Sequence, residues 1–218
     1  VPLIVTCRDR REGGAIDYPE SLRVDVLLEA LAAGADFIDL EFANYARPEV
    51  KRKIDIALGK SPRTRLILSA HDFTRPFDDI GRLYRDMVAA CPPAVPKLVY
   101  TANHINDCFA AFDLLHEADR PSIVLCMGQA GLISRILAKK LGGQVTFASL
   151  DESAATAPGQ LTLAQFKGLY RHDLIDAATE LFGVIADPVG HSLSPAIHNA
   201  CFADLKMDRL YLPLLVQG

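Results

Sequence analysis

Six short apolar runs, rich in β-branched residues, recur along this chain, and each is separated from the next by a stretch with helical spacing. Such runs predict buried β-strands. In chain order the runs are Leu3–Cys7, Phe37–Phe42, Leu66–Ala70, Lys97–Tyr100, Ile123–Met127 and Val145–Leu150.

The intervals between the runs carry the spacing and the stop signals of amphipathic helices. Leu27 and Leu31 precede Gly34, and Ile133 and Leu137 precede Gly142. A glycine just after the last apolar position is typical of a helix C-terminus. Strand and helix alternating in this way predict parallel β/α units.

Two α/β architectures use such units, an open Rossmann-type sheet and a closed (β/α)8 barrel. No Gly-x-Gly-x-x-Gly turn follows any of the runs, and no Gly-x-x-x-x-Gly-Lys loop is present. Because these glycine-rich turns mark nucleotide-binding open sheets, their absence favours a (β/α)8 TIM barrel with six of its eight units in this chain.

The composition points to a small-molecule partner. The formal net charge is −4 over 218 residues, half of which are hydrophobic. Neither an extended basic block for nucleic acid nor a membrane-length apolar stretch is visible in the sequence. The five cysteines lack metal-type or paired spacing, so we expect no metal site and a reducing compartment such as the cytoplasm.

Lys97 is the most informative single residue, because it lies within one of the apolar runs. A buried ammonium is costly unless it is paired or functional. In an apolar, cation-rich pocket its pKa falls and the amine attacks carbonyls, which suggests a Schiff-base lysine with His71 as proton-transfer partner. The alternative is an edge-strand lysine whose stem snorkels to water.

Other polar residues cluster near the ends of the predicted strands. In a barrel they would converge at the mouth formed by the C-terminal ends of the strands. Each also has a plainer interpretation, as a surface loop cation, a solvated acid or a helix-surface ion pair. The residues are Arg8, Glu12, Glu41, His71, Asp72 and Arg135.

Several motifs together resemble one family, type I 3-dehydroquinate dehydratase, over residues 1–180. They are VTCRDRREGG, IDLEF, SAHDF, PKLV, ADRPSIVLCMGQAGLISR and TAPGQ, in that order. The resemblance implies a (β/α)8 barrel that dehydrates 3-dehydroquinate to 3-dehydroshikimate through an imine, without metal or cofactor.

The resemblance also implies roles for single residues. Lys97 would form the imine, His71 would be the general acid and base, and Glu12 would pair with that histidine. Arg135 would hold the substrate carboxylate, since a guanidinium binds it bidentately. The expected substrate-binding residues are Arg8, Arg135, Thr156, Gln160, Phe73, Met127 and Phe147. Glu41 matches a family residue without an assigned role, and Thr156 stands where the family usually has Ser.

The C-terminal motif FGVIADPVGHSLSPAIHN resembles the opening of shikimate dehydrogenase, which predicts a second domain over 181–218. We expect a strand-helix-strand unit with Ser194 as helix N-cap and Pro195 as first helical residue. Ser192 and Ser194 would then offer the positive helix end to a shikimate carboxylate. His191 and His198 are not spaced like zinc ligands.

The two resemblances together suggest a fragment of a bifunctional enzyme, with residues missing at both ends. The NADP-binding half of the dehydrogenase would lie beyond Gly218, and the first and sixth runs would be open sheet edges. Two alternatives are a non-catalytic quinate- or shikimate-sensing regulator built from the same domains and a Schiff-base aldolase of another barrel family. A plant source would place the protein in the plastid, and a homodimer is compatible with the family.

Overall fold

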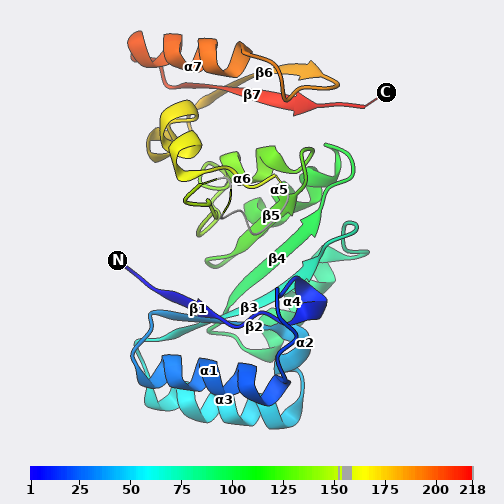
Figure 1. The fold of residues 1–218 in the computed structure, drawn as a ribbon, viewed down its shortest axis with the longest axis vertical. Helices are drawn as coiled ribbons and strands as arrows, with labels where there is room; N and C mark the ends of the chain where they lie inside the picture. Colours follow the sequence, from blue (N-terminus) through cyan, green and yellow to red (C-terminus); the bar gives the residue numbers. More distant parts are fainter. Residues whose placement is uncertain (152, 154–158, 218) are drawn as a thin grey trace. The chain divides into compact units, whose positions relative to one another are not determined.

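The structure is a computed structural model that describes residues 1–151, 153 and 159–217. The chain divides into two compact units. The first consists of Val1–Phe73 and Asp78–Val99, and the second consists of Thr74–Phe77 and Tyr100–Gly218. Figure 1 shows the order of the elements along the chain. Within the described residues, no helix combines the length and apolar character needed to cross a membrane.

The first unit contains parallel strands in the order β1-β2-β3-β4, joined by helices. Thr6, Asp39 and Ile67 lie side by side across β1, β2 and β3. This parallel pairing confirms the predicted β/α units. The elements are β1 (Ile4–Thr6), η1 (Arg10–Glu12), α1 (Glu20–Ala32), β2 (Phe37–Glu41), α2 (Phe42–Tyr45), α3 (Pro48–Lys60), β3 (Arg65–Asp72), α4 (Ile80–Ala90) and β4 (Val95–Thr101).

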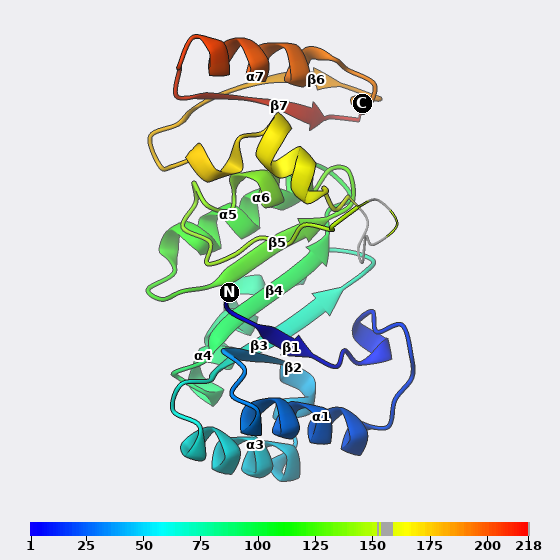
Figure 2. The same ribbon diagram turned by 60° about the vertical axis from the view of Figure 1, so that its left-hand side comes forward.

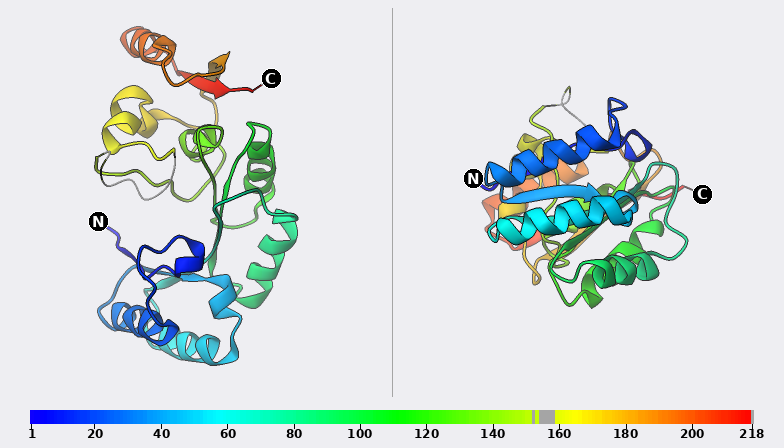
Figure 3. Two further views of the ribbon diagram at one scale, coloured as in Figure 1. Left: turned by 45° about the vertical axis from the view of Figure 1, so that its right-hand side comes forward. Right: turned by 90° about the horizontal axis from the view of Figure 1, so that it is seen from below.

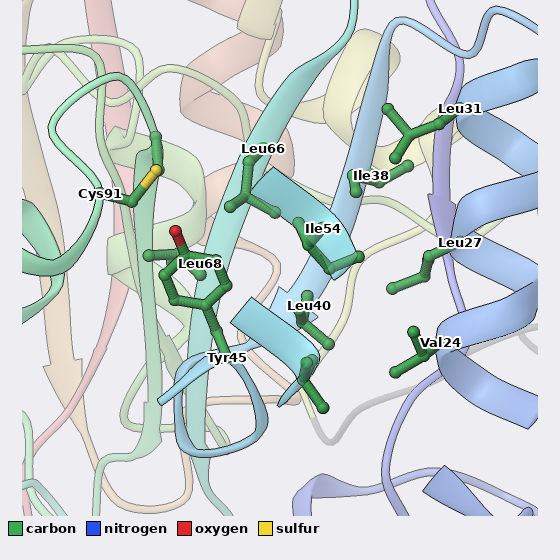
Figure 4. Close-up of a cluster of buried hydrophobic side chains, with 12 residues drawn as sticks. Val24, Leu27, Leu31, Ile38, Leu40, Tyr45, Ile54, Leu66, Leu68 and Cys91 are labelled. Atoms are coloured by element: carbon green, nitrogen blue, oxygen red, sulfur yellow. The ribbon is translucent and has the colours of Figure 1, made fainter. Parts of the chain in front are cut away.

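Helices α1 and α3 lie next to one another against one face of this sheet, as the view from below in Figure 3 shows. Their apolar side chains meet those of the sheet in the cluster of Figure 4. In α1 the buried positions are Val24, Leu27 and Leu31, spaced three and four residues apart as a helix face requires. The cluster also includes Ile54 from α3, Ile38 and Leu40 from β2, and Leu66 and Leu68 from β3.

The second unit includes the last residues of β4, and just after them the backbone N–H of Ala102 donates to the carbonyl of Met127 at the end of β5. Helix α6 contains Ile133 and Leu137, the apolar positions from which a helix was predicted before Gly142. The elements are α5 (Asp107–Glu117), β5 (Ile123–Met127), α6 (Leu132–Leu137), the π-helix η3 (Gln165–Leu169), the 3₁₀ turn η4 (His172–Leu174), β6 (Glu180–Ala186), α7 (Ser194–Asp204) and β7 (Arg209–Leu215).

The sixth apolar run, Val145–Leu150, does not form the predicted strand. Among the described residues it makes a single bridge, between Ser149 and Thr162. The backbone of Ser149 bonds to Leu161 and Leu163, and Leu150 is 82% exposed. The run therefore lacks both the backbone pairing and the burial of a core strand, and the prediction of a sixth sheet strand here was wrong.

The C-terminal strand-helix-strand prediction is confirmed. Strands β6 and β7 are parallel neighbours, in register from Glu180 opposite Arg209 to Ala186 opposite Leu215. Helix α7, which connects them, packs on this two-stranded sheet, as Figure 2 shows. A parallel pair requires such a crossover connection.

Candidate active site

Strand alternation places two carboxylates on the face of β2 opposite its apolar side chains. Ile38 and Leu40 point towards the helices in Figure 4. Because successive side chains of a strand point to opposite faces, Asp39 and Glu41 point the other way. Both are almost fully buried, with 2% and 1% of their surface exposed. Buried carboxylates require partners of opposite charge.

Arg8, just after β1, is one of those partners. Its guanidinium donates to Asp39 Oδ1 at 2.8 Å, to Glu41 Oε1 at 2.8 Å and to Ser69 Oγ at 2.7 Å. Ser69 in turn donates to Asp39 Oδ1 at 2.7 Å. The Arg8 side chain is only 14% exposed, so the interpretation of Arg8 as a surface-loop cation was wrong.

Further polar groups bind the Glu41 carboxylate in addition to Arg8. Asn44 donates to Glu41 Oε2 at 2.9 Å, and the backbone N–H of Asp9 donates to Glu41 Oε1 at 2.9 Å. The buried Arg23 of α1 pairs with Asp9 at 2.7 Å and reaches Glu41 at 3.5 Å. The hydrogen bond from Arg11 holds the pKa of Asp9 well below its usual range, although burial opposes this. These contacts give Glu41 a structural explanation as an anchor for Arg8.

Lys97, the third residue of β4, pairs with Asp39 inside this network. Its Nζ lies 2.8 Å from Asp39 Oδ2, and only 9% of its side chain is exposed. Burial lowers the pKa of Lys97, Asp39 opposes that effect, and the Arg8 cation adds to it. A buried, ion-paired amine is not a lysine that snorkels to water from a sheet edge, so that alternative was wrong.

His71, near the end of β3, is held by Glu12 of η1. Glu12 Oε2 lies 3.0 Å from both the backbone N and the Nδ1 of His71. Burial and the cations Arg8 and Lys97 lower the pKa of His71 to about 2, so the ring is neutral. With the carboxylate accepting from Nδ1–H, the lone pair stands on Nε2, where it can act as a base. Glu12 is therefore not a solvated acid.

Glu12 itself has an unusual proton affinity. Burial raises its pKa to about 7, the nearby Glu41 carboxylate adds to the effect, and Arg8 opposes it. Asp39 differs: burial would raise its pKa, but the charges of Lys97 and Arg8 hold it well below its usual range. Near neutral pH Asp39 is thus a fixed anion, whereas Glu12 can exchange a proton.

Phe73, predicted to line the pocket, stacks beside His71 with ring centroids 6.5 Å apart. Its ring also lies against Gly13, whose φ of 92° ends η1 in the left-handed region. A side chain at Gly13 would collide with the Phe73 ring. Glycine here therefore serves both the turn that carries Glu12 and the position of Phe73.

Five of the predicted substrate-binding residues belong to the second unit. Arg135 of α6 is 2% exposed and is not a helix-surface cation, while burial lowers its pKa. Met127 ends β5 and is also buried, and Phe147 lies in the segment without a strand. Gln160 lines a cavity of about 300 Å³ together with Gln129 and neighbouring residues. Thr156 lies outside the described residues.

The start of α7 differs in detail from the prediction. Ser194 is the first residue of the helix, and Leu193 with helical backbone angles occupies the cap position. Ser194 is therefore not the N-cap and Pro195 is the second helical residue, because the helix begins one residue early. Ser192 Oγ accepts the backbone N–H of Ser194 at 3.3 Å, so both serines do lie at this helix end.

Sequence reasoning missed Asp39 and Ser69 as members of the site. A signal existed, because Asp39 and Glu41 are two acids spaced by two in an otherwise apolar strand run. Such spacing places both on one buried face, where each needs a cation. Ser69 offered no comparable signal, because serine is often buried without such a role.

The decisive comparison is with protein families. The model of type I 3-dehydroquinase matches residues 1–176, which is most of the chain. The chain belongs to the type I 3-dehydroquinase family. A second model, of the shikimate dehydrogenase substrate-binding domain, matches residues 184–218. Both resemblances seen in the sequence are therefore confirmed.

The relatives of this chain include bifunctional proteins and proteins named as dehydratases alone. The chain is 36% identical over 221 aligned residues to the chloroplastic bifunctional 3-dehydroquinate dehydratase/shikimate dehydrogenase of Arabidopsis thaliana. The alignment covers all of this chain and 36% of the Arabidopsis protein. It is 34% identical to a 3-dehydroquinate dehydratase of Dehalococcoides mccartyi, over 78% of this chain and 75% of that protein. The chain thus spans about a third of the length of the Arabidopsis protein.

Solved structures agree with this assignment. The dehydroquinate dehydratase and shikimate dehydrogenase from S. pombe AroM matches the whole chain with a TM-score of 0.64 at 27% identity, over 41% of its own length. A second match is the type I 3-dehydroquinate dehydratase from Clostridium difficile, solved with covalently modified comenic acid. The match covers 76% of this chain and 66% of the Clostridium chain, with a TM-score of 0.66 at 25% identity. The α/β class with a parallel sheet and type I dehydroquinase barrel neighbours is thereby confirmed.

Proposed function

We propose that this chain dehydrates 3-dehydroquinate to 3-dehydroshikimate through a Schiff base on Lys97. One observation carries the proposal: a buried amine with a lowered pKa interacts electrostatically with a neutral histidine that is held by a carboxylate. A neutral amine is the nucleophile towards a ketone, and a neutral imidazole is the base that such a reaction needs. Membership of the type I family supports the same chemistry.

The reaction divides into three steps. The Lys97 ammonium gives one proton to His71, and the neutral Nζ attacks the ketone carbon of the substrate. His71 returns that proton to the hydroxyl of the carbinolamine, which leaves as water, so that an iminium ion with one N–H remains. His71 Nε2 then takes the proton at C2, and the electron pair of that C–H bond moves into the iminium, so that no isolated carbanion forms. Finally the β-hydroxyl leaves with a proton from His71, and water hydrolyses the imine to release product and free Lys97.

Arg135 is the group that we propose for the substrate carboxylate. It is buried, and its Nε has no hydrogen-bond partner among the described residues. A planar guanidinium makes two parallel hydrogen bonds to a carboxylate, and burial strengthens such a charge-assisted pair. Arg8, Phe73, Met127, Phe147, Thr156 and Gln160 are proposed as further substrate contacts.

For residues 181–218 we propose part of a dehydrogenase substrate site, with the domain boundary near residue 180. Ser192 and Ser194 at the start of α7 would bind the carboxylate of shikimate. The parent protein would reduce 3-dehydroshikimate with NADPH. The turn between β6 and α7 has no Gly-x-Gly-x-x-Gly sequence, so this turn does not fit the phosphates of NADP.

A direct assay tests this function and separates it from the sensing regulator. The protein at its natural length, called the natural-length protein below, is mixed with 3-dehydroquinate. Formation of the conjugated enone of dehydroshikimate is followed by ultraviolet absorbance. We expect turnover without added metal or cofactor. Binding of substrate without any absorbance change would instead support the regulator.

The proposed compartment is the cytoplasm, or the plastid if the source is a plant.

A further inference from the structure

Asp39 links the two cations that stand in the proposed site. Its Oδ2 accepts from Lys97 Nζ at 2.8 Å, and its Oδ1 accepts from Arg8 and Ser69 at 2.8 and 2.7 Å. The side chain is 1% exposed, so water contributes little to its solvation. Each oxygen is therefore committed, one to Lys97 and the other to groups that hold the carboxylate in place.

The charges that act on Lys97 come from other elements of the first unit. Asp39 and Glu41 lie on β2, Arg8 follows β1, and the neutral His71 lies on β3. Asp39 is in hydrogen-bond contact with the amine, whereas Glu41 is turned towards Arg8 and Asn44. Asp39 Oδ2 is thus a direct hydrogen-bond partner that helps to position the Lys97 amine.

We propose that Asp39 is the positioning residue and counter-ion of the Lys97 iminium. The inference rests on the proposed function, because it concerns the imine on Lys97. When Nζ forms the C=N bond and water leaves, the nitrogen keeps one N–H and a positive charge. That N–H replaces the ammonium opposite Asp39 Oδ2, so the carboxylate stabilises the cation that draws electrons from C2.

Asp39 is not the base of the reaction. Its pKa is held low by Lys97 and Arg8 despite burial, so it stays an anion and does not take up the C2 proton. The carboxylate favours the charged form of Lys97 in the resting protein and the charged iminium afterwards. Its removal should therefore make the amine easier to deprotonate and at the same time make turnover slower.

This pair of opposite effects is what the experiment measures. Asp39→Asn keeps the shape of the side chain and removes its charge. The pH titration of the Lys97 amine is followed by NMR of ε-¹³C-labelled lysine in the natural-length protein, with Lys97→Arg identifying the resonance. Turnover is measured in the same preparations. Asp25→Asn, on the exposed face of α1, is the matched loss of one negative charge.

We expect Asp39→Asn to titrate Lys97 at lower pH than the wild type and to lose about 10²-fold in turnover. Asp25→Asn should change neither. An unchanged Lys97 titration, or wild-type turnover in Asp39→Asn, would overturn the inference. If the wild type itself forms no imine with 3-dehydroquinate, the proposed function fails instead, and the two failures are thus distinguishable.

Asp39→Glu keeps the inference testable if the Asn variant does not fold. The longer side chain retains the charge but displaces the oxygens, so we expect Lys97 to titrate near its wild-type pH while turnover falls. A Lys97 titration at clearly lower pH in Asp39→Glu would show that the carboxylate charge does not set it, which would also overturn the inference. Circular dichroism verifies the fold of each variant.

Discussion

Glu12 Oε2 accepts the backbone N–H of His71 at 3.0 Å and also lies 3.0 Å from Nδ1 of the same residue. One carboxylate oxygen thus fixes both the backbone and the ring of the proposed base. Since Nδ1 is committed, Nε2 carries the lone pair. The same contact explains why Glu12 is buried rather than solvated.

The stability of the protein should depend on the protonation of Glu12. Burial raises its pKa to about 7 from an ordinary value of 4.5, so the folded state favours the protonated carboxyl. That contribution is fully present below about pH 4.5 and is lost as the pH rises through about 7. Relative to the wild type, Glu12→Gln should gain on the order of 3 kcal/mol between these pH values.

Thermal unfolding of both proteins at about pH 4.5 and about pH 8 measures this difference. Glu29→Gln, on the exposed face of α1, is the control and should follow the wild type at both pH values. A stability difference between Glu12→Gln and wild type that does not change with pH would show that Glu12 titrates normally.

The nucleophile can be identified by covalent trapping. With 3-dehydroquinate and borohydride, we expect the natural-length protein to gain ligand mass on the peptide that contains Lys97 and to lose activity, because reduction makes the imine irreversible. Lys97→Ala should be inactive and unlabelled, and Lys53→Ala, in an exposed position of α3, should behave as wild type. An adduct on another peptide would refute the assignment, as would full activity in Lys97→Ala.

His71→Ala tests the proposed base. Removing the imidazole should reduce turnover about 10²-fold or more, because proton transfer at C2 loses its acceptor. The imine should still form slowly, so borohydride trapping at Lys97 should persist. His116→Ala, an exposed position in α5, is the matched control. Wild-type turnover in His71→Ala would transfer the role of base to another group.

Gly13→Ala should disturb Phe73 and the turn that carries Glu12. Gly13 and Gly34 both have positive φ, at 92° and 80°, but only the added methyl at Gly13 would meet the Phe73 ring, whereas Gly34 has nothing within 4 Å. Both substitutions incur backbone strain of about 1 to 2 kcal/mol. We expect Gly13→Ala to be the less stable of the two in thermal unfolding and to bind substrate more weakly. Equal effects of the two substitutions would contradict a role for the Gly13–Phe73 contact.

Much of the fold is readable from periodicity. Apolar runs and helical intervals predict the parallel units, because burial on both faces of a parallel strand leaves an unbroken apolar signature. The sixth run shows the limit of this rule. Val145–Leu150 has the composition of a strand, yet Ser149 pairs with Thr162 and Leu150 faces solvent. Composition cannot state whether a neighbouring strand is present to accept the backbone hydrogen bonds.

The sequence by itself determined the strand and helix alternation, the family motifs and the identity of Lys97, His71 and Glu12 as chemically notable residues. Only the tertiary structure decided that Asp39, 58 residues before Lys97 in the sequence, is the partner of that amine. The physical reason is that a charge in a core strand demands a counter-charge without specifying its position along the chain. Strand register and side-chain alternation in β2 supply that position, because they turn Ile38 and Leu40 to the apolar cluster and Asp39 to the cations.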